Sequence, residues 1–231
     1  MIMLLKNKIV NFFWENVPVQ VKNVKHIYSH RETPPLWIND DFLYLHIPKS
    51  AGTSVAKALG RKETGHFTYD FLRAKYPKVE NKDKYFVIMR NPIDRIGSTF
   101  KYVKGLHERY GSSILPEINR YENVNDFIMD GLVKSDIHNH YFLRPVSDFV
   151  LNIPKEKLYY VEFDNLNYNL KRFFNKELSQ NIELPYENIS PKIRNQTISS
   201  AASEVITSLY SDDYFIYSRL SGKGYIKNNV D

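Results

Sequence analysis

The sequence predicts an α/β fold in which a central, mostly parallel sheet is flanked by helices. Three short apolar and aromatic runs stand at residues 42–47, 85–89 and 157–163, and a segment with helical periodicity follows each of them. Strands that helices cover on both faces read as nearly continuous apolar runs, as these three do. Their alternation with helices predicts parallel strands joined by helical crossovers.

Length and composition predict one domain with an arm. The chain has 231 residues, of which 42% are hydrophobic and 25% charged, as in ordinary globular proteins. We expect residues 1–40 to form an N-terminal amphipathic helix followed by a connecting arm over 17–40, and residues 41–231 to form a single α/β domain. The net charge of +6, from 32 basic and 26 acidic groups, favours an anionic partner. The lack of cysteine excludes disulfides, thiolate zinc sites and cysteine nucleophiles, and it fits a cytoplasmic location.

Residues 1–16 have the pattern of an amphipathic helix. Leu5, Ile9, Phe12 and Phe13 fall along one helical face, and two lysines interrupt the apolar run. This interruption argues against a signal peptide, and no stretch of the sequence is long and apolar enough to span a bilayer. We expect the helix to pack on the domain, and peripheral membrane contact through residues 1–16 is the alternative.

The first candidate site follows the first predicted strand. Pro48 ends the strand, and a loop of small residues around one cation follows, Lys49-Ser50-Ala51-Gly52. Thr53 and Ser54 are good helix starters, and an apolar helical stripe continues from them. Such a loop lets backbone N–H groups approach an anion, so we interpret it as a phosphate cradle. The alternative is a strand–turn–helix unit that needs small residues only for packing.

The second candidate site is the corner at Arg90, directly after the second predicted strand. Asn91 is a natural N-cap and Pro92 is a natural first helical residue. Arg95 and Ser98 fall on the polar side of this helix, and Ser98 lies about two turns into it. Ligands of open parallel sheets bind beyond the carboxyl ends of the strands, where Lys49 and Arg90 both stand. We therefore expect one ligand with two separated anionic groups.

A simpler interpretation of the second corner remains open. Arg90 and Arg95 could serve only to pair with carboxylates such as Asp94 or Glu108. Taken singly, each arginine fits a structural ion pair as well as it fits a ligand site.

Three histidines are candidates for acid–base chemistry. Gly65 marks a turn before a short helix at about residues 68–75, so His66 stands at a loop-to-helix junction, where a side chain can point into a site. His138 and His140 form the other pair. Because the chain has neither cysteine nor an HExxH arrangement, we expect no metal at these residues.

The remaining segments predict further elements of the same domain. Residues 104–150 suit a lid or wall beside the site, with a helix over 124–132. Asp164 is expected to cap the helix after the third strand, and residues 179–196 form a polar loop. A last helix covers about residues 201–209, and an aromatic segment over 214–217 closes the core.

Two of these stretches together resemble the PAPS-dependent glycan sulfotransferases, a family that includes heparan sulfate 2-O-sulfotransferase and related carbohydrate sulfotransferases. The stretch HIPKSAGTS, at 46–54, is similar to the family loop that binds the 5′-phosphosulfate of PAPS (3′-phosphoadenosine 5′-phosphosulfate). The stretch RNPIDRIGS, at 90–98, resembles the family's R-[ND]-P-x-x-R-x-x-S element, which binds the 3′-phosphate. GHFTYDF, at 65–71, resembles the segment with a proposed catalytic histidine. The resemblance spans about residues 42–217.

The resemblance implies a P-loop NTPase-like, three-layer fold and transfer of a sulfuryl group from PAPS to a carbohydrate hydroxyl, without metal or nucleic acid. Lys49 would hold the 5′-phosphosulfate together with the loop and helix start at Ser50, Ala51, Gly52, Thr53 and Ser54. Arg90 and Ser98 would hold the 3′-phosphate. His66 would take the proton of the acceptor, assisted by Lys49 at the departing group.

The chain departs from the family pattern at one place, and two other functions stay open. Many relatives have a histidine before an arginine-proline-glutamine step, whereas this chain has Phe142-Leu143-Arg144-Pro145-Val146. One alternative is a P-loop kinase or nucleotide hydrolase, although Walker loops place lysine after the second glycine and Lys49 precedes Gly52. The other is a non-catalytic module that binds polyanions. The sequence predicts neither the acceptor nor the oligomeric state.

Overall fold

The computed structural model describes residues 22, 40–60, 65–111, 114–134, 136–185 and 197–228. Within them, the α/β prediction is confirmed: a four-stranded, mostly parallel sheet is packed against helices. The predictions of a helix over 1–16 and of an arm over 17–40 lie outside the described residues, apart from Lys22 and Asp40. No helix in the described part of the chain combines the length and apolarity needed to cross a membrane.

The sheet contains β1 (Phe42–Tyr44), β2 (Lys84–Met89), β3 (Leu158–Glu162) and β4 (Tyr225–Lys227), in that spatial order. β1, β2 and β3 are parallel, as predicted, and β4 pairs antiparallel with β3. β4 was not predicted, because its three residues lack an apolar run. Its position depends on Glu162, whose carboxylate accepts hydrogen bonds from the backbone N–H groups of Gly222 (2.8 Å) and Gly224 (3.0 Å).

The sheet half of the molecule has an aromatic core. Phe86 of β2 lies at its centre, with its ring centroid 4.9 Å from that of Tyr44 and 5.1 Å from that of Phe173. Phe173 belongs to α8 (Leu166–Glu177), which packs beside β3, while α3 (Gly52–Ala58) follows β1. Every residue of β1 and β3 is buried, as expected for strands whose two faces are both covered.

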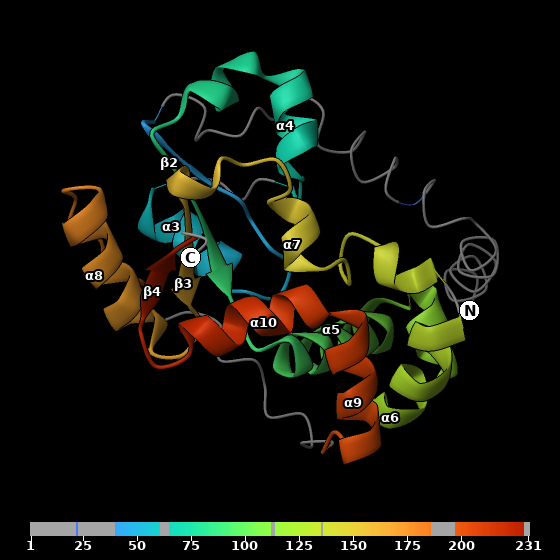
Figure 1. Cartoon of the computed structure of the whole chain (residues 1–231). Coiled ribbons are helices and arrows are strands. Elements are labelled where there is room, and N and C mark those ends of the chain that lie inside the picture. Colours follow the sequence, from blue (N-terminus) through green and yellow to red (C-terminus); the bar gives the residue numbers. More distant parts are fainter. Residues whose placement is uncertain are drawn as a thin grey trace.

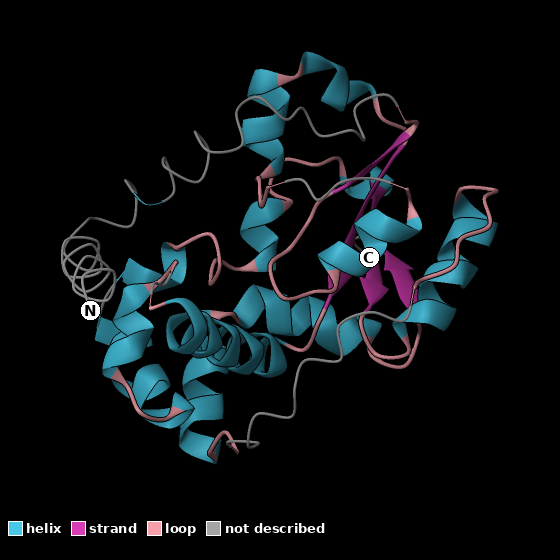
Figure 2. Cartoon of the chain, turned by 180° about the vertical axis from the view of Figure 1, so that it is seen from behind, coloured by secondary structure: helices cyan, strands magenta, loops and turns pink. Residues whose placement is uncertain are grey.

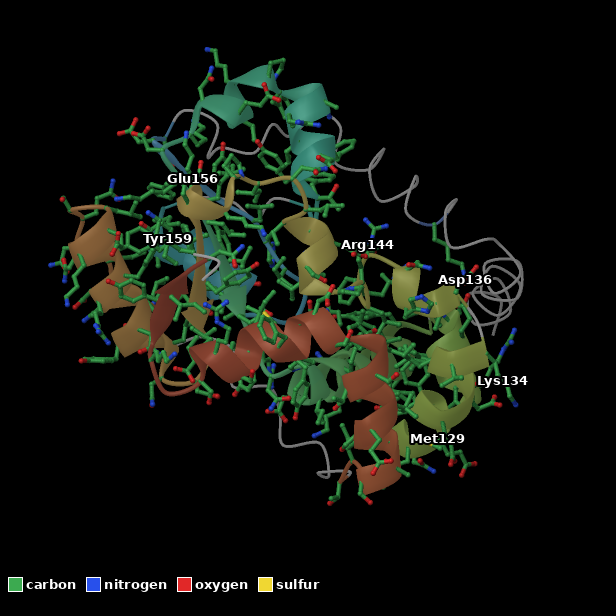
Figure 3. The ribbon with its side chains drawn as sticks, in the orientation of Figure 1. Met129, Lys134, Asp136, Arg144, Glu156 and Tyr159 are labelled. Atoms are coloured by element: carbon green, nitrogen blue, oxygen red, sulfur yellow. The ribbon has the colours of Figure 1, made fainter. Side chains whose placement is uncertain are left out.

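The other half of the molecule is helical and has a hydrophobic core of its own. It is built from α5 (Pro92–Tyr110), η3 (Pro116–Arg120), α6 (Val124–Asp126), a π-helical stretch η4 (Phe127–Leu132), η5 (Asp136–Asn139) and α9 (Ser200–Leu209). Figure 2 shows the strands gathered on one side and these helices on the other. Met129, Lys134 and Asp136 lie along the helical half, away from the sheet (Figure 3).

Further helices lie around the sheet and between the halves: α4 (Tyr69–Lys75), η2 (Pro77–Asn81), α7 (Val146–Phe149), η6 (Lys155–Lys157) and α10 (Ser211–Leu220). In Figure 1, α5 and α10 lie below the sheet, near the end toward which the β2 arrow points. The aromatic segment over 214–217 therefore belongs to a helix that the sequence analysis did not predict.

The predicted cap of α8 is wrong. Asn165 is the N-cap residue, with a left-handed backbone (φ 52°) and no capping side chain. The carboxylate of Asp164 instead accepts a hydrogen bond from the hydroxyl of Tyr217 (3.1 Å). The capping predicted for Asn91 is confirmed, since its side chain accepts a hydrogen bond from the N–H of Ile93 at 2.9 Å.

Arg95 does not stand on a solvated polar face of α5. Its side chain is fully buried, and its guanidinium lies 3.8 Å from the carboxylate of Asp213 on α10. It also donates a hydrogen bond to the carbonyl of Arg144 (3.0 Å). The carboxylate of Asp213 accepts from the N–H groups of Val146 (2.7 Å) and Ser147 (2.8 Å). We call this cluster the junction, because it ties α5, α7 and α10 together.

Candidate functional site

The loop after β1, residues 48–52, has an unusual backbone, and we call it the cradle loop. Lys49 (φ 62°) and Ala51 (φ 58°) are both left-handed, although neither is glycine. Such conformations are costly for residues with a Cβ, and they cluster at ligand sites. Left-handed residues also occur in concave loops that bind anions through backbone N–H groups. In this loop the N–H of Ser50 donates to the carbonyl of Ile47 (3.3 Å). The backbone therefore has a shape suited to binding an anion.

The side chains of the cradle loop and of the first turn of α3 complete this corner. The hydroxyl of Ser50 is buried, and no described group hydrogen-bonds to it. Thr53 and Ser54, predicted to start a helix, lie in the first turn of α3, whose N-cap residue is Ala51. The buried hydroxyl of Ser50 therefore calls for a partner outside the described chain.

Gly52 is required by the close approach of His46. A Cβ at position 52 would lie 1.7 Å from Nε2 of His46, so only glycine leaves room for this ring. The buried imidazole of His46 thus covers the end of the cradle loop. Sequence analysis assigned Gly52 to close backbone approach by a ligand; the structure adds that a side chain already occupies part of that space.

Arg90, at the carboxyl end of β2, reaches the cradle loop. Its Nη1 donates a hydrogen bond to the carbonyl oxygen of Lys49 (3.1 Å), and its guanidinium stacks 4.4 Å from the ring centroid of Phe163, just beyond β3. Burial lowers the pKa of Arg90, while the carboxylates of Asp94 and Asp164 act in the opposite direction. Arg90 makes no ion pair with any described carboxylate, so the structural alternative of an Arg90–Asp94 pair is not what the structure contains.

His66 lies next to the cradle loop in a defined orientation. Its Nδ1 lies 3.1 Å from the carbonyl oxygen of His46, and the two imidazole centroids are 4.3 Å apart. A carbonyl oxygen only accepts, so this contact requires the hydrogen on Nδ1 and leaves the lone pair of the neutral ring on Nε2. Thr68, which caps α4 by accepting from the N–H of Phe71, fixes the chain just after His66. These contacts fix the orientation of the imidazole ring.

A row of aromatic side chains connects the lysine to the histidine. The ammonium nitrogen of Lys49 lies 3.9 Å from the ring centroid of Tyr102. Tyr102 stacks on Phe142 (5.7 Å, interplanar angle 2°), and Phe142 meets His66 edge-on (5.3 Å). Tyr141 stacks beside His66 at 5.9 Å. We call Tyr102, Tyr141 and Phe142 the aromatic wall.

Sequence reasoning missed the aromatic wall, although one signal for it was present. Tyr102 follows Ser98 by four residues on a predicted helix, so the two share a face. Nothing local to Tyr141 or Phe142 indicates that they return to the site from 39 and 40 residues beyond Tyr102. Burial, and to a smaller extent Tyr102, raises the pKa of Tyr141 to about 12. Tyr141 is therefore a neutral phenol at physiological pH.

The structure separates the other predicted residues. Ser98 is half-buried on α5, and no described contact joins it to Arg90; the helical rise places it about 10 Å along the axis from Asn91. His140 is buried, and its Nδ1 accepts a hydrogen bond from the N–H of Phe142 (3.3 Å), so it supports the aromatic wall. His138 has no described ring contact with the site.

The described residues contain no group of three or more histidine and carboxylate side chains placed to hold a metal ion. No known protein family, curated protein or solved structure matches the chain.

Arg144, labelled in Figure 3 beside α7, lies between the two halves, and burial lowers the pKa of its guanidinium. The site therefore consists of an anion-shaped loop, two cations, an oriented imidazole and an aromatic wall.

Proposed function

We propose that this protein is a sulfotransferase that moves a sulfuryl group from PAPS to a hydroxyl of a carbohydrate acceptor. The observation that carries the proposal is the hydrogen bond from Arg90 to the carbonyl of Lys49. It joins two strand-end corners, 41 residues apart in sequence, at one site, as a donor with anionic groups at both ends requires. The fold is proposed to be of the P-loop NTPase-like, three-layer kind.

The cradle loop is assigned to the 5′-phosphosulfate. Its left-handed residues give it a backbone of the kind found in anion-binding loops, and the buried hydroxyl of Ser50 has no described hydrogen-bond partner. Thr53 and Ser54 follow in the first turn of α3. Lys49 adds a positive charge to balance the negative charge that develops on the departing phosphate oxygen. Cationic groups and N–H donors stabilise this negative charge most strongly when they are already fixed in position and little water is present.

Arg90 is assigned to the 3′-phosphate, with Ser98 as its partner on α5. A guanidinium recognises phosphate through paired N–H donors, and the Nε of Arg90 is buried without a described hydrogen-bond partner. Phe163 beneath the guanidinium restricts its orientation. A phosphate would supply the opposite charge that no described carboxylate supplies through an ion pair.

His66 is assigned as the general base. The donor supplies the sulfuryl group as an activated phosphosulfate. Nε2 of His66 takes the proton of the acceptor hydroxyl as its oxygen bonds to sulfur, and the bond from sulfur to the phosphate oxygen breaks, which leaves adenosine 3′,5′-bisphosphate. The protonated imidazole then releases its proton to solvent. His140 is not assigned this role, since it is buried and its Nδ1 already accepts from the backbone.

The acceptor is proposed to be a surface polysaccharide, an oligosaccharide or a glycolipid. A cytoplasmic location, with peripheral membrane contact through residues 1–16, belongs to the same proposal. The position of Lys49 before Gly52, rather than after it, favours sulfuryl transfer over a P-loop kinase or nucleotide hydrolase. An oriented imidazole beside the cradle loop favours an enzyme over a module that only binds polyanions.

The proposal is tested by ligand protection in a thermal melt. Adenosine 3′,5′-bisphosphate at 100 times its dissociation constant should add about 2.7 kcal/mol to the stability of the native state, without Mg²⁺. Lys49→Ala should weaken this protection, whereas His66→Ala should keep it and abolish transfer of labelled sulfate from PAPS to a glycan. Equal or better protection by Mg-ATP would instead favour a kinase, and salt-sensitive binding of heparin that ignores the bisphosphate would favour the polyanion module.

A further inference from the structure

The ammonium of Lys49 rests on an aromatic ring from another element. Its nitrogen lies 3.9 Å from the ring centroid of Tyr102 on α5, well inside the range of cation–π attraction. Lysine side chains have four rotatable bonds and lose much entropy when they are held in one place. The left-handed backbone of Lys49 fixes where its side chain leaves the cradle loop, and the ring fixes where it ends.

The ring of Tyr102 is itself held in place. It lies nearly parallel to the ring of Phe142, at 5.7 Å and an interplanar angle of 2°. The ring of Phe142 is buried and contacts His66 edge-on at 5.3 Å. Tyr102 remains 41% exposed, so part of it borders solvent. A buried stack therefore supports a ring that contacts the lysine at the edge of the site.

We propose that Tyr102 is a positioning residue for Lys49: its ring holds the ammonium beside the cradle loop, ready to bind the anionic end of the donor. This inference rests on the proposed function and assigns a role to a residue outside both sequence motifs. An ammonium above a ring keeps N–H donors that point away from the ring, so Lys49 can contact the ring and an anion together. Without the ring, Lys49 would keep its positive charge, but nothing would hold its ammonium in one position.

The experiment measures the dissociation constant of adenosine 3′,5′-bisphosphate by calorimetry for a set of Tyr102 variants of the full chain. Tyr102→Leu and Tyr102→Gln both remove the ring and should bind about 2- to 30-fold more weakly, the range that corresponds to a cation–π contact. Tyr102→Phe keeps a ring and should rescue the affinity. Tyr110→Leu, which removes an exposed tyrosine ring near the end of the same helix, is the matched control and should bind like the wild type.

A double-mutant cycle with Lys49 shows whether the ring acts through the lysine. In a Lys49→Ala background, Tyr102→Leu should change the dissociation constant by less than about twofold, because the partner of the ring is gone. An undiminished effect in that background overturns the inference, and so does unchanged or tighter binding by Tyr102→Leu, which would mean that the ring competes with the ligand. If wild-type protein does not bind the bisphosphate, the proposed function and this inference both fail; if it binds and the two effects add, only the inference fails.

Discussion

Two arginines five residues apart, Arg90 and Arg95, stand in contrasting surroundings. Arg95 lies in the junction, where Asp213 balances its charge at 3.8 Å and backbone carbonyls accept from its Nη2. Arg90 lies at the cradle loop, where it has one carbonyl and one aromatic ring but no described carboxylate in an ion pair. Among the described residues, Arg95 therefore has a carboxylate at ion-pair distance, and Arg90 does not.

This difference shows how to tell a structural cation from a ligand-binding one. A buried charge is costly to leave unpaired, so an arginine with an internal carboxylate is explained by the fold alone. An arginine that is desolvated enough to lower its pKa, yet lacks an ion pair, calls for an anion from elsewhere. The spacing R-x-x-x-x-R treats the two residues alike, and only their contacts distinguish them.

The largest effect is expected in the junction. Asp213→Ala would leave Arg95 as an uncompensated buried charge and would expose the N–H groups of Val146 and Ser147 to an apolar cavity. We expect a loss of about 3–5 kcal/mol in the free energy of unfolding, measured by urea denaturation. The double replacement Arg95→Met with Asp213→Leu should recover much of this loss, because no charge remains buried. A loss below about 1 kcal/mol for Asp213→Ala would show that the pair does not tie the helices together.

Arg90→Ala should give the opposite result to the junction variant. Its removal leaves no carboxylate unpaired, so the loss in unfolding free energy should stay near the typical 1 kcal/mol for a point substitution. Binding of adenosine 3′,5′-bisphosphate should weaken about 10- to 100-fold, as expected for charge-assisted hydrogen bonds to a phosphate.

The matched control for Arg90→Ala is Arg172→Ala on α8. The guanidinium of Arg172 also donates to a backbone carbonyl, that of Lys223 at 3.3 Å, and also lies over an aromatic ring, that of Tyr225 at 5.5 Å. It should leave bisphosphate binding unchanged. If Arg172→Ala weakened bisphosphate binding as much as Arg90→Ala, the effect of Arg90→Ala would not be specific to the cradle loop.

The sequence predicted the parts of this molecule that depend on local patterns. The three parallel strands and the cap at Asn91 follow from short runs and spacings. Phe142, noted only as a departure from a family pattern, proved to be part of the aromatic wall. Arg95 was placed on a polar face, because helical periodicity cannot show that Asp213 meets it from 118 residues later. The features that could not be predicted depend on contacts between residues far apart in the sequence, as in the pairing of Arg95 with Asp213.

Gly52→Ala tests how closely the cradle loop and the candidate base are linked. The new methyl group would lie 1.7 Å from Nε2 of His46, so this ring must rotate away, and its neighbour His66 loses a contact at 4.3 Å. We expect a loss of about 1–3 kcal/mol in unfolding free energy, as for other overpacked sites. Turnover should fall by a larger factor than affinity for the bisphosphate. Equal losses in both would show that Gly52 serves the anion alone and not the orientation of His66.

The smallest effect is expected for Tyr141→Phe at alkaline pH. Burial raises the pKa of Tyr141 to about 12, so an unfolded chain releases this proton near pH 10 while the folded chain retains it. The contribution to stability is complete below pH 10 and is lost as the pH rises toward 12. Linkage gives a loss of about 1 kcal/mol at pH 11 for the wild type, which phenylalanine avoids.

The comparison for Tyr141 is Tyr210 in the junction, whose pKa burial also raises and whose hydroxyl donates to the carbonyl of Leu143 at 2.8 Å. Tyr210→Phe removes that buried hydrogen bond, so it should lower the free energy of unfolding at neutral pH by about 1 kcal/mol. For Tyr141→Phe the expected change lies at pH 11, and urea titrations at pH 7 and pH 11 separate the two. Equal losses at pH 7 would mean that the aromatic wall is as much a structural element as the junction, which would weaken its assignment to the site.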